Sequence, residues 1–290
     1  MNMQNGNQDR KNAAQSPQHG VSSELNANAK LSSSRVPLFG LGTYRLEGRE
    51  GQRAIESALE MGYRLLDTAQ MYYNEEQVGR AVRNSKVPRE EIFLITKLQQ
   101  NRNVVQSVQD SLRKLDTDYV DLLLIHWVMG NDLQTWQTME KLVAQGLVRS
   151  IGLSNFYGAD FTEIVENGEI RPAVNQLECH IYRQNLDFLE EYSQLGVVLQ
   201  AWSPFGAGKT IGTNNLSQHR VLAEIAAEVG ASTEQVTLRY LMNLGISVIP
   251  RSRNPQHQLE NLESIQIQLT DEQMQRIRAL NRNERLFSWN

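Results

Sequence analysis

The sequence predicts an α/β protein in which residues 35–290 form a single (β/α)8 TIM barrel. The chain has 290 residues, and barrels of this kind often reach that length as one domain. From Val36 onward, short apolar runs alternate with amphipathic, helix-like segments, and the alternation occurs eight times. Eight strand-helix units with short connections are typical of a parallel sheet that closes into a barrel.

A doubly wound Rossmann sheet would show a similar alternation, so a further observation separates the two folds. A Rossmann domain carries a G-x-G-x-x-G turn after its first strand. Here Gly40-Leu-Gly42 is followed by Thr43-Tyr44-Arg45, with no third glycine. This pattern counts against a Rossmann fold, although not against a nucleotide cofactor.

Each unit of the barrel is assigned from its own pattern. The expected strands are runs rich in leucine and β-branched residues, at positions 38–43, 64–66, 92–96, 119–125, 149–153, 173–177, 197–201 and 246–249. Amphipathic helices follow every strand, and the seventh and eighth strands are each followed by two: 51–61, 75–83, 104–115, 133–145, 159–165, 186–195, 220–229, 233–244, 258–262 and 271–280.

Residues 1–34 differ in composition from the rest of the chain. They contain 16 Asn, Gln and Ser residues and no Phe, Trp, Tyr or Ile. Such a segment cannot bury enough apolar surface to offset its ordering entropy. We expect it to be a disordered tail.

Composition excludes several classes of protein. With 29 Lys and Arg against 33 Asp and Glu, the chain lacks the basic surplus of a nucleic-acid binder. No apolar run approaches the roughly 18 residues of a membrane span. The single cysteine, Cys179, leaves no internal disulfide and no cysteine-based metal site. We expect a cytoplasmic monomer without bound metal.

Three ionisable residues stand where expected strands end. They are Asp67, Lys97 and His126, and each terminates an otherwise apolar run. Active sites of barrels lie at the C-terminal ends of the strands. An ion pair or a loop cap would explain one such residue, but three at successive strand ends favour a functional site.

Tyr72 completes this set, because it lies five residues beyond Asp67 in the loop that leaves the second strand. An ammonium group favours phenolate, so Lys97 is expected to lower the pKa of the phenol, with Asp67 holding Lys97 protonated. His126 would donate a hydrogen bond to a carbonyl oxygen. Together the four residues would form a proton donor suited to carbonyl reduction. The adjacent Tyr73 shows that a tyrosine in this loop needs no chemical role.

Five sequence blocks surround these residues and the later strand ends: Asp67-Thr-Ala-Gln-Met-Tyr72-Tyr-Asn-Glu75, Thr96-Lys97, Leu124-Ile-His126-Trp127, Gly152-Leu-Ser-Asn-Phe156 and Ile249-Pro-Arg-Ser252. In their order and spacing they resemble the signature blocks of the aldo-keto reductases, in the style of the bacterial diketogluconate and methylglyoxal reductases. The resemblance implies a barrel that binds NADPH without a Rossmann domain. It places the catalytic tetrad on Asp67, Tyr72, Lys97 and His126.

The resemblance also assigns the residues around the nicotinamide. It implies that Ser154, Asn155 and Gln176 hold the carboxamide and that Trp202 stacks on the ring, where many members have tyrosine. Helix capping and core filling are the alternative roles for these side chains. It further places Thr43, Tyr44 and Asp67 beside the cofactor.

The segment Ser203-Pro-Phe-Gly-Ala-Gly-Lys-Thr210 looks like a P-loop, but Ser203 stands at its first glycine position and no partner for Mg²⁺ is evident. We reject a kinase or ATPase. We expect Ser203 and Gly206 to lie near the cofactor pyrophosphate, which backbone N–H groups can bind.

At the 2′-phosphate end the chain departs from the family pattern. Arg251 stands where the family has lysine, and His257 stands where it has arginine. The resemblance assigns this end of the cofactor to Arg251, Ser252, Arg253, His257 and Asn261. Histidine carries a charge for only part of the physiological pH range. We therefore expect NADPH to be preferred, with NADH as a weaker alternative; a basic helix start without a ligand is the other interpretation.

For the substrate, the resemblance implies a pocket formed by Tyr44, Tyr72, His126 and Trp127, with Phe156 or Trp289 adding to it. The expected reaction is reduction of aldehydes, dicarbonyls or keto-sugars to alcohols by hydride transfer, with Tyr72 as proton donor. This is an NADP-dependent alcohol dehydrogenase or carbonyl reductase activity (EC 1.1.1.-). Two alternatives remain open: a cofactor-binding, redox-sensing barrel with slow turnover, and a Schiff-base aldolase that uses Lys97.

Overall fold

The computed structural model describes residues 36–206, 210–211, 214–215 and 219–288. The expected tail at residues 1–34 and the candidate pocket residue Trp289 lie outside the described residues.

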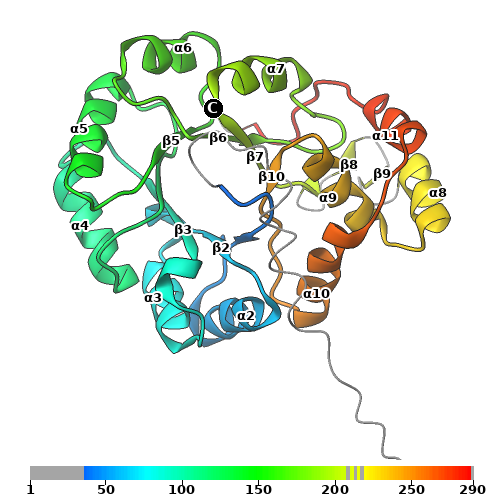
Figure 1. Cartoon of the computed structure of the whole chain (residues 1–290), viewed down its shortest axis with the longest axis horizontal. Helices are drawn as coiled ribbons and strands as arrows, with labels where there is room; N and C mark the ends of the chain where they lie inside the picture. The colour runs from blue at the N-terminus through cyan, green and yellow to red at the C-terminus, as the bar shows by residue number, and fades with distance from the viewer. Residues whose placement is uncertain (1–35, 207–209, 212–213, 216–218, 289–290) are drawn as a thin grey trace, which may run out of the picture.

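Eight parallel strands form one sheet that curls into a barrel, so the predicted fold is confirmed (Figure 1). The ends of the sheet meet, because Phe39 bridges Val248 and the Gly40 N–H donates to the Val248 carbonyl at 2.9 Å. In sheet order the strands are β1 (Leu41–Gly42), β2 (Leu65–Asp67), β3 (Phe93–Leu98), β4 (Leu122–Ile125), β5 (Ile151–Ser154), β6 (Val174–Glu178), β7 (Val198–Trp202) and β10 (Ser247–Val248).

Helices surround the sheet (Figure 1). They are α2 (Gly48–Met61), α3 (Glu75–Asn84), α4 (Val104–Leu115), α5 (Asp132–Ala144), α6 (Gly158–Asn167), α7 (Leu186–Leu195), α8 (Arg220–Val229), α9 (Thr233–Asn243), α10 (Pro255–Glu263) and α11 (Asp271–Arg278). Within the described residues, no helix is both long and apolar enough to cross a membrane.

Two apolar cores lie on opposite faces of the sheet. Leu66 belongs to the larger core between strands and helices, whereas Leu65 and Ile95 belong to a smaller core inside the barrel. Successive side chains of a strand face opposite sides, so Asp67 and Lys97 share the inward face with Leu65 and Ile95. The strands therefore present apolar side chains deep in the barrel and ionisable ones where they end.

The first and last strands are shorter than expected. Regular pairing covers only Leu41–Gly42 in β1 and Ser247–Val248 in β10. Pro250 follows β10 and lacks the N–H that would continue the ladder. The antiparallel pair of β8 (Thr210–Ile211) and β9 (Asn214–Asn215) was not predicted, because its short polar sequence shows no alternating pattern.

Candidate active site

Lys97 lies at the centre of a buried cluster at the C-terminal ends of β2 and β3. Its Nζ donates to Asp67 Oδ1 at 2.6 Å, to the Thr68 carbonyl at 2.9 Å and to the Tyr72 hydroxyl at 3.3 Å. Three acceptors match the three N–H groups of an ammonium ion. Lys97 is fully buried and Asp67 is 2% exposed, so the ion pair is shielded from solvent.

The environment of Tyr72 corrects one expectation. Lys97 was expected to lower the pKa of the phenol, but burial raises the pKa of Tyr72 well above its ordinary value, and the charges of Asp67 and Tyr44 raise it further. The ammonium fails to lower it because Asp67 neutralises Lys97 at 2.6 Å. The phenol therefore keeps its proton at neutral pH.

The pKa of Lys97 itself is lowered by burial, and Asp67 opposes the shift through its charge and its hydrogen bond. Desolvation disfavours the charged form of a buried amine, whereas a carboxylate in contact favours it. The charge and the hydrogen bond of Asp67 therefore favour a protonated Lys97.

His126 lies beside Tyr72, directly after β4. The two rings meet nearly edge-on, with centroids 5.7 Å apart and planes at 75°. Burial lowers the pKa of His126 to about 2, and the positive charge of Lys97 adds to this effect. The imidazole is therefore neutral across the physiological range and carries one N–H, which suits it to donate a hydrogen bond without a charge.

A buried asparagine fixes the loop that carries Tyr72. Asn74 donates to the Thr43 and Leu46 carbonyls at 2.7 and 3.0 Å, and its Oδ1 accepts from the Thr68 hydroxyl at 2.8 Å. These bonds tie the end of β2 to the loop after β1. Tyr72 faces the cluster, while Tyr73 is 80% exposed, so its hydroxyl has no part in the site.

Beyond the ion pair, the candidate nicotinamide residues lie at the ends of β5, β6 and β7. Asn155 has a positive φ of 63°, and its Nδ2 donates to Ser154 Oγ at 3.0 Å. Trp202 Nε1 donates to Asn155 Oδ1 at 3.0 Å. Gln176 Nε2 donates to Asp67 Oδ2 at 2.7 Å. The structure therefore brings these four predicted residues together beside Asp67.

The loop after β7 begins with left-handed backbone. Ser203 has a φ of 52° and Gly206 a φ of 64°, and the Gly206 N–H donates to the Ser203 carbonyl at 2.8 Å. Residues 207–209 of the P-loop-like segment lie outside the described residues.

Three arginines gather between the start of the barrel and α10. Arg253 donates to the Arg45 carbonyl. Partial desolvation lowers the pKa of the largely exposed Arg251, and the charges of Arg253 and Arg45 lower it further. Within the described part of the chain none of the three forms an ion pair with an acidic side chain. Such a group of cations favours a bound anion.

The other predicted residues of this end lie on or near α10. Ser252 Oγ accepts from the Asn254 N–H at 3.1 Å, and Asn261 is buried on the helix. His257 is exposed in the first turn. Among the described residues, no hydrogen bond or ring contact joins His257 to Arg251.

Residues 38–282 match the model of the aldo/keto reductase family. The chain belongs to the aldo-keto reductase family. The glyoxal reductase of Bacillus subtilis is 37% identical over 258 residues, which cover 87% of this chain and 91% of that protein. The 2,5-diketo-D-gluconic acid reductase B of Corynebacterium sp. is 39% identical over 250 residues, 84% of this chain and 88% of that protein.

Solved structures agree with the fold of this aldo-keto reductase. The Bombyx mori aldo-keto reductase in complex with NADP matches with a TM-score of 0.79 at 36% identity, over 87% of this chain and 92% of that one. An aldo-keto reductase from a Medee basin deep-sea metagenome library reaches a TM-score of 0.83 at 36% identity, over 87% of this chain and 94% of that one. The family resemblance stated from the sequence is confirmed.

A small cavity of about 190 Å³ adjoins the cluster of this aldo-keto reductase. Half of its lining residues are aromatic, and one acid and one base are among the others: Trp127, Val128, Asn155, Tyr157, Glu178, Trp202, Arg285 and Phe287. Trp127, predicted for the pocket, stacks on His126 with ring centroids 5.8 Å apart. Tyr44 lies against Tyr72, with centroids 5.1 Å apart.

Phe156 corrects another expectation, because it does not line this cavity. It is fully buried in the core between strands and helices, and its carbonyl accepts from Asn175 Nδ2 at 2.8 Å. The left-handed backbone of Asn155 turns the chain there, so the next residue, Tyr157, faces the cavity. Arg285 reaches the same wall from the C-terminal segment, its guanidinium 4.7 Å from the Tyr157 ring centroid.

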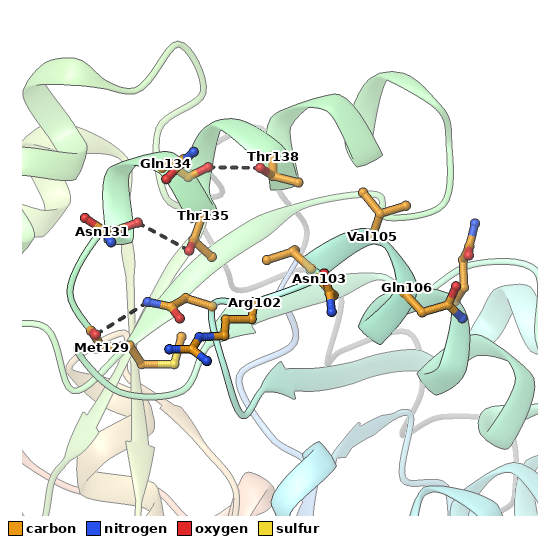
Figure 2. Close-up of a pocket in the computed structure, with 12 residues that line it drawn as sticks. Arg102, Asn103, Val105, Gln106, Met129, Asn131, Gln134, Thr135 and Thr138 are labelled. Atoms are coloured by element: carbon orange, nitrogen blue, oxygen red, sulfur yellow. Dashed lines mark hydrogen bonds between the residues drawn. The ribbon is translucent and has the colours of Figure 1, made fainter.

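A larger hollow of about 840 Å³ lies outside the barrel, between the starts of α4 and α5. Figure 2 shows that polar side chains dominate its walls, among them Asn103, Gln106 and Asn131. Arg102 is the one ionisable residue in its described lining. No proton-transfer pair faces this groove, so its size alone does not make it the active site.

Proposed function

We propose that this aldo-keto reductase uses NADPH to reduce aldehydes, dicarbonyls or keto-sugars to alcohols, with Tyr72 as proton donor. The observation that carries the proposal is the buried Lys97–Asp67 pair, whose ammonium contacts the Tyr72 hydroxyl at 3.3 Å. A protonated phenol thus lies between a buried cation and a neutral imidazole. This arrangement suits the protonation of an oxygen on which negative charge develops.

In this mechanism NADPH supplies the hydride. The raised pKa of Tyr72 keeps the phenol protonated until the carbonyl oxygen becomes strongly basic, and the proton then passes from Tyr72 to that oxygen. Lys97 stabilises the phenolate that forms. His126, held neutral by burial, donates its one N–H to the same oxygen and helps to orient the carbonyl.

The residues present fit NADPH at both of its ends. Ser154, Asn155 and Gln176 offer amide and hydroxyl groups for the nicotinamide carboxamide, and the half-buried Trp202 offers a ring face. At the other end, Arg251 and Arg253 form part of a cationic group that suits a phosphate. The NADP complex of the Bombyx mori aldo-keto reductase supports this assignment.

The cavity favours small substrates. Its volume of about 190 Å³ and its aromatic walls suit a compact carbonyl compound better than a bulky one. The named relatives that reduce glyoxal and a diketogluconic acid point to the same class.

A Schiff-base aldolase requires a free amine at Lys97, with a lone pair directed at a substrate carbonyl. The three acceptors around Nζ instead match an ammonium whose hydrogens are all engaged. A slow redox-sensing barrel would bind NADPH but would turn over poorly with every carbonyl, so turnover rates distinguish it from the proposed enzyme.

The proposal is tested by NADPH oxidation with glyoxal, methylglyoxal, simple aldehydes and keto-sugars. We expect steady turnover with at least one of them, and a loss of roughly 10²–10⁴-fold in kcat for Tyr72→Phe, the scale of general acid catalysis. Tyr73→Phe, which removes the exposed neighbouring hydroxyl, is the matched control and should retain full activity. Near-normal activity of Tyr72→Phe would reject Tyr72 as the donor.

A further inference from the structure

A row of three buried polar side chains crosses the inside of the barrel and ends in the candidate active site. Gln176 on β6 pairs in register with Gln200 on β7, and Gln200 pairs with Ser247 on β10. Gln200 and Ser247 are fully buried, and Gln176 is 2% exposed. Barrel interiors are usually filled by branched apolar side chains, so a polar row that crosses three strands calls for an explanation.

The row is a continuous chain of hydrogen bonds. Gln176 Nε2 donates to Gln200 Oε1 at 2.6 Å. Gln200 Nε2 donates to Ser247 Oγ at 3.1 Å, and Ser247 Oγ donates to the Pro37 carbonyl at 2.8 Å. At its upper end, Gln176 Nε2 also donates to Asp67 Oδ2 at 2.7 Å.

Both ends of this chain can only accept hydrogen bonds, and this fixes its direction. A serine hydroxyl has one hydrogen, which Ser247 gives to the Pro37 carbonyl, so its oxygen must accept from Gln200. Gln200 therefore turns its NH₂ toward Ser247 and its carbonyl toward Gln176. Gln176 must then direct both of its N–H groups inward, one to Gln200 and one to the carboxylate of Asp67.

We infer that Gln200 and Ser247 are positioning residues that lock the amide of Gln176 in one orientation and thereby present its Oε1 as a hydrogen-bond acceptor. With both N–H groups engaged, Oε1 is the polar atom of Gln176 left to meet a ligand. An amide free to rotate by half a turn would present its NH₂ to the ligand in one orientation and its carbonyl oxygen in the other. The locked amide instead selects a ligand with an N–H at this point.

This inference rests on the proposed function, because the ligand group it implies is the NH₂ of the nicotinamide carboxamide. The order of dependence runs across the strands, from β10 through β7 to β6. Ser247 orients Gln200, Gln200 orients Gln176, and Gln176 accepts from the carboxamide. Neither Gln200 nor Ser247 touches the cofactor.

The test compares dissociation constants of NADP⁺ and its 3-acetylpyridine analogue, in which a methyl group replaces the carboxamide NH₂. Tryptophan fluorescence quenching on the full chain gives both constants without any reaction. We expect the wild type to prefer NADP⁺ by about three- to tenfold, the scale of one hydrogen bond. In Gln200→Met and in Ser247→Ala the preference should fall below about twofold, because only the bond to Asp67 then restrains the Gln176 amide and its Oε1 is no longer fixed toward the ligand.

Three comparisons separate orientation from general loosening. A general loosening of the barrel would raise the dissociation constants of NADP⁺ and of the analogue by the same factor and leave their ratio unchanged. Thr237→Val removes a buried hydroxyl on α9 that bonds the Thr233 carbonyl at 2.8 Å, and it should retain the wild-type ratio. In a Gln176→Met background, Ser247→Ala should cause no further change in the ratio.

The inference would be overturned if either variant folds and keeps the wild-type ratio of the two dissociation constants. If Gln200→Met does not fold, Ser247→Ala provides the test. A wild type that binds NADP⁺ tightly but shows no preference over the analogue would also overturn it, while leaving the proposed function intact. A wild type that fails to bind NADP⁺ would instead reject the proposed function.

Discussion

The two ends of the proposed cofactor site differ in how firmly their polar groups are held. At the nicotinamide end, Asp67, Lys97 and Gln176 are each at most 2% exposed and hydrogen-bonded to one another or to neighbouring groups. At the phosphate end, Arg251 and His257 are exposed.

This difference shows where substitution is tolerated. A buried polar group without a partner carries a large desolvation cost. Replacing one residue of the nicotinamide end would therefore leave the polar group of its hydrogen-bond partner buried and unpaired. Exposed cations are solvated without a ligand, and each can be replaced by another donor at little cost to the fold. Of the chain's departures from the family pattern, Arg251 and His257 lie at the exposed end, and Trp202, at the nicotinamide end, is itself only half-buried.

The largest effect is expected from a substitution of Lys97 at the buried nicotinamide end. Lys97→Met removes the cation that stabilises the Tyr72 phenolate, and kcat should fall by roughly 10²–10⁴-fold, the scale of a lost general acid. Because the proposed mechanism places both residues in one proton-donating unit, the double variant with Tyr72→Phe should be hardly slower than either single variant. Steady-state kinetics of the three variants measures this coupling, and losses that multiply would contradict a shared unit.

A substitution of Arg251 at the exposed phosphate end should change cofactor binding alone. Arg251→Met should weaken NADPH by roughly 10- to 100-fold, the range of hydrogen bonds to charged groups. NADH, which lacks the 2′-phosphate, should bind almost as before, and kcat at saturating NADPH should be retained. Arg220→Met, which removes an exposed arginine from α8, is the charge-matched control. Equal weakening of both cofactors would place Arg251 elsewhere along the cofactor.

Burial at the catalytic end also predicts a pH dependence of stability. The folded chain holds His126 neutral because its pKa is lowered to about 2, whereas in the unfolded chain a histidine takes up a proton below about pH 6.5. Acid therefore favours unfolding, and at about pH 5 this single group should lower the free energy of unfolding by about 2 kcal/mol relative to neutral pH.

Denaturant titrations of the wild type and His126→Gln check this expectation. The variant should lose less stability than the wild type between about pH 7 and 5, and the two curves should run parallel above about pH 7.5, where both states leave the ring neutral. Equal losses on acidification would show that the folded state takes up a proton at His126.

The position of a side chain could be predicted from the sequence where the direction of its strand and the alternation of side chains along that strand determine it. Asp67, Lys97 and His126 end successive parallel strands, so the barrel brings them together, and Tyr72 needs only a short loop to join them. Alternation could also have identified Gln200, which lies two residues before Trp202 on β7 and therefore shares its inward face.

Other features depend on contacts that no local pattern records. Phe156 and Tyr157 are adjacent aromatic residues, and the left-handed turn at Asn155 decides which of them faces the cavity. Arg285 reaches the cavity from the C-terminal segment, far along the chain from the strands it meets. The pKa of Tyr72 was predicted in the wrong direction, because its burial and the neutralising contact of Lys97 with Asp67 appear only in the folded structure.

The smallest expected effect concerns His257 and sharpens the contrast between the two ends. Arginine offers a permanent charge and a forked set of donors that match a phosphate, whereas a neutral imidazole offers one donor. His257→Arg should therefore tighten NADPH by about tenfold at about pH 7.5, while NADH changes little, because one charged hydrogen bond is gained at an exposed position. The melting temperature should stay the same, since His257 is exposed and, among the described residues, makes no side-chain contact that its replacement would break.

Fluorescence quenching with both cofactors measures the ratio of the dissociation constants of NADH and NADPH, and His257→Gln supplies the uncharged comparison. If the ratio is the same in all three proteins, His257 does not reach the phosphate, and Arg251 and Arg253 must provide the selectivity on their own.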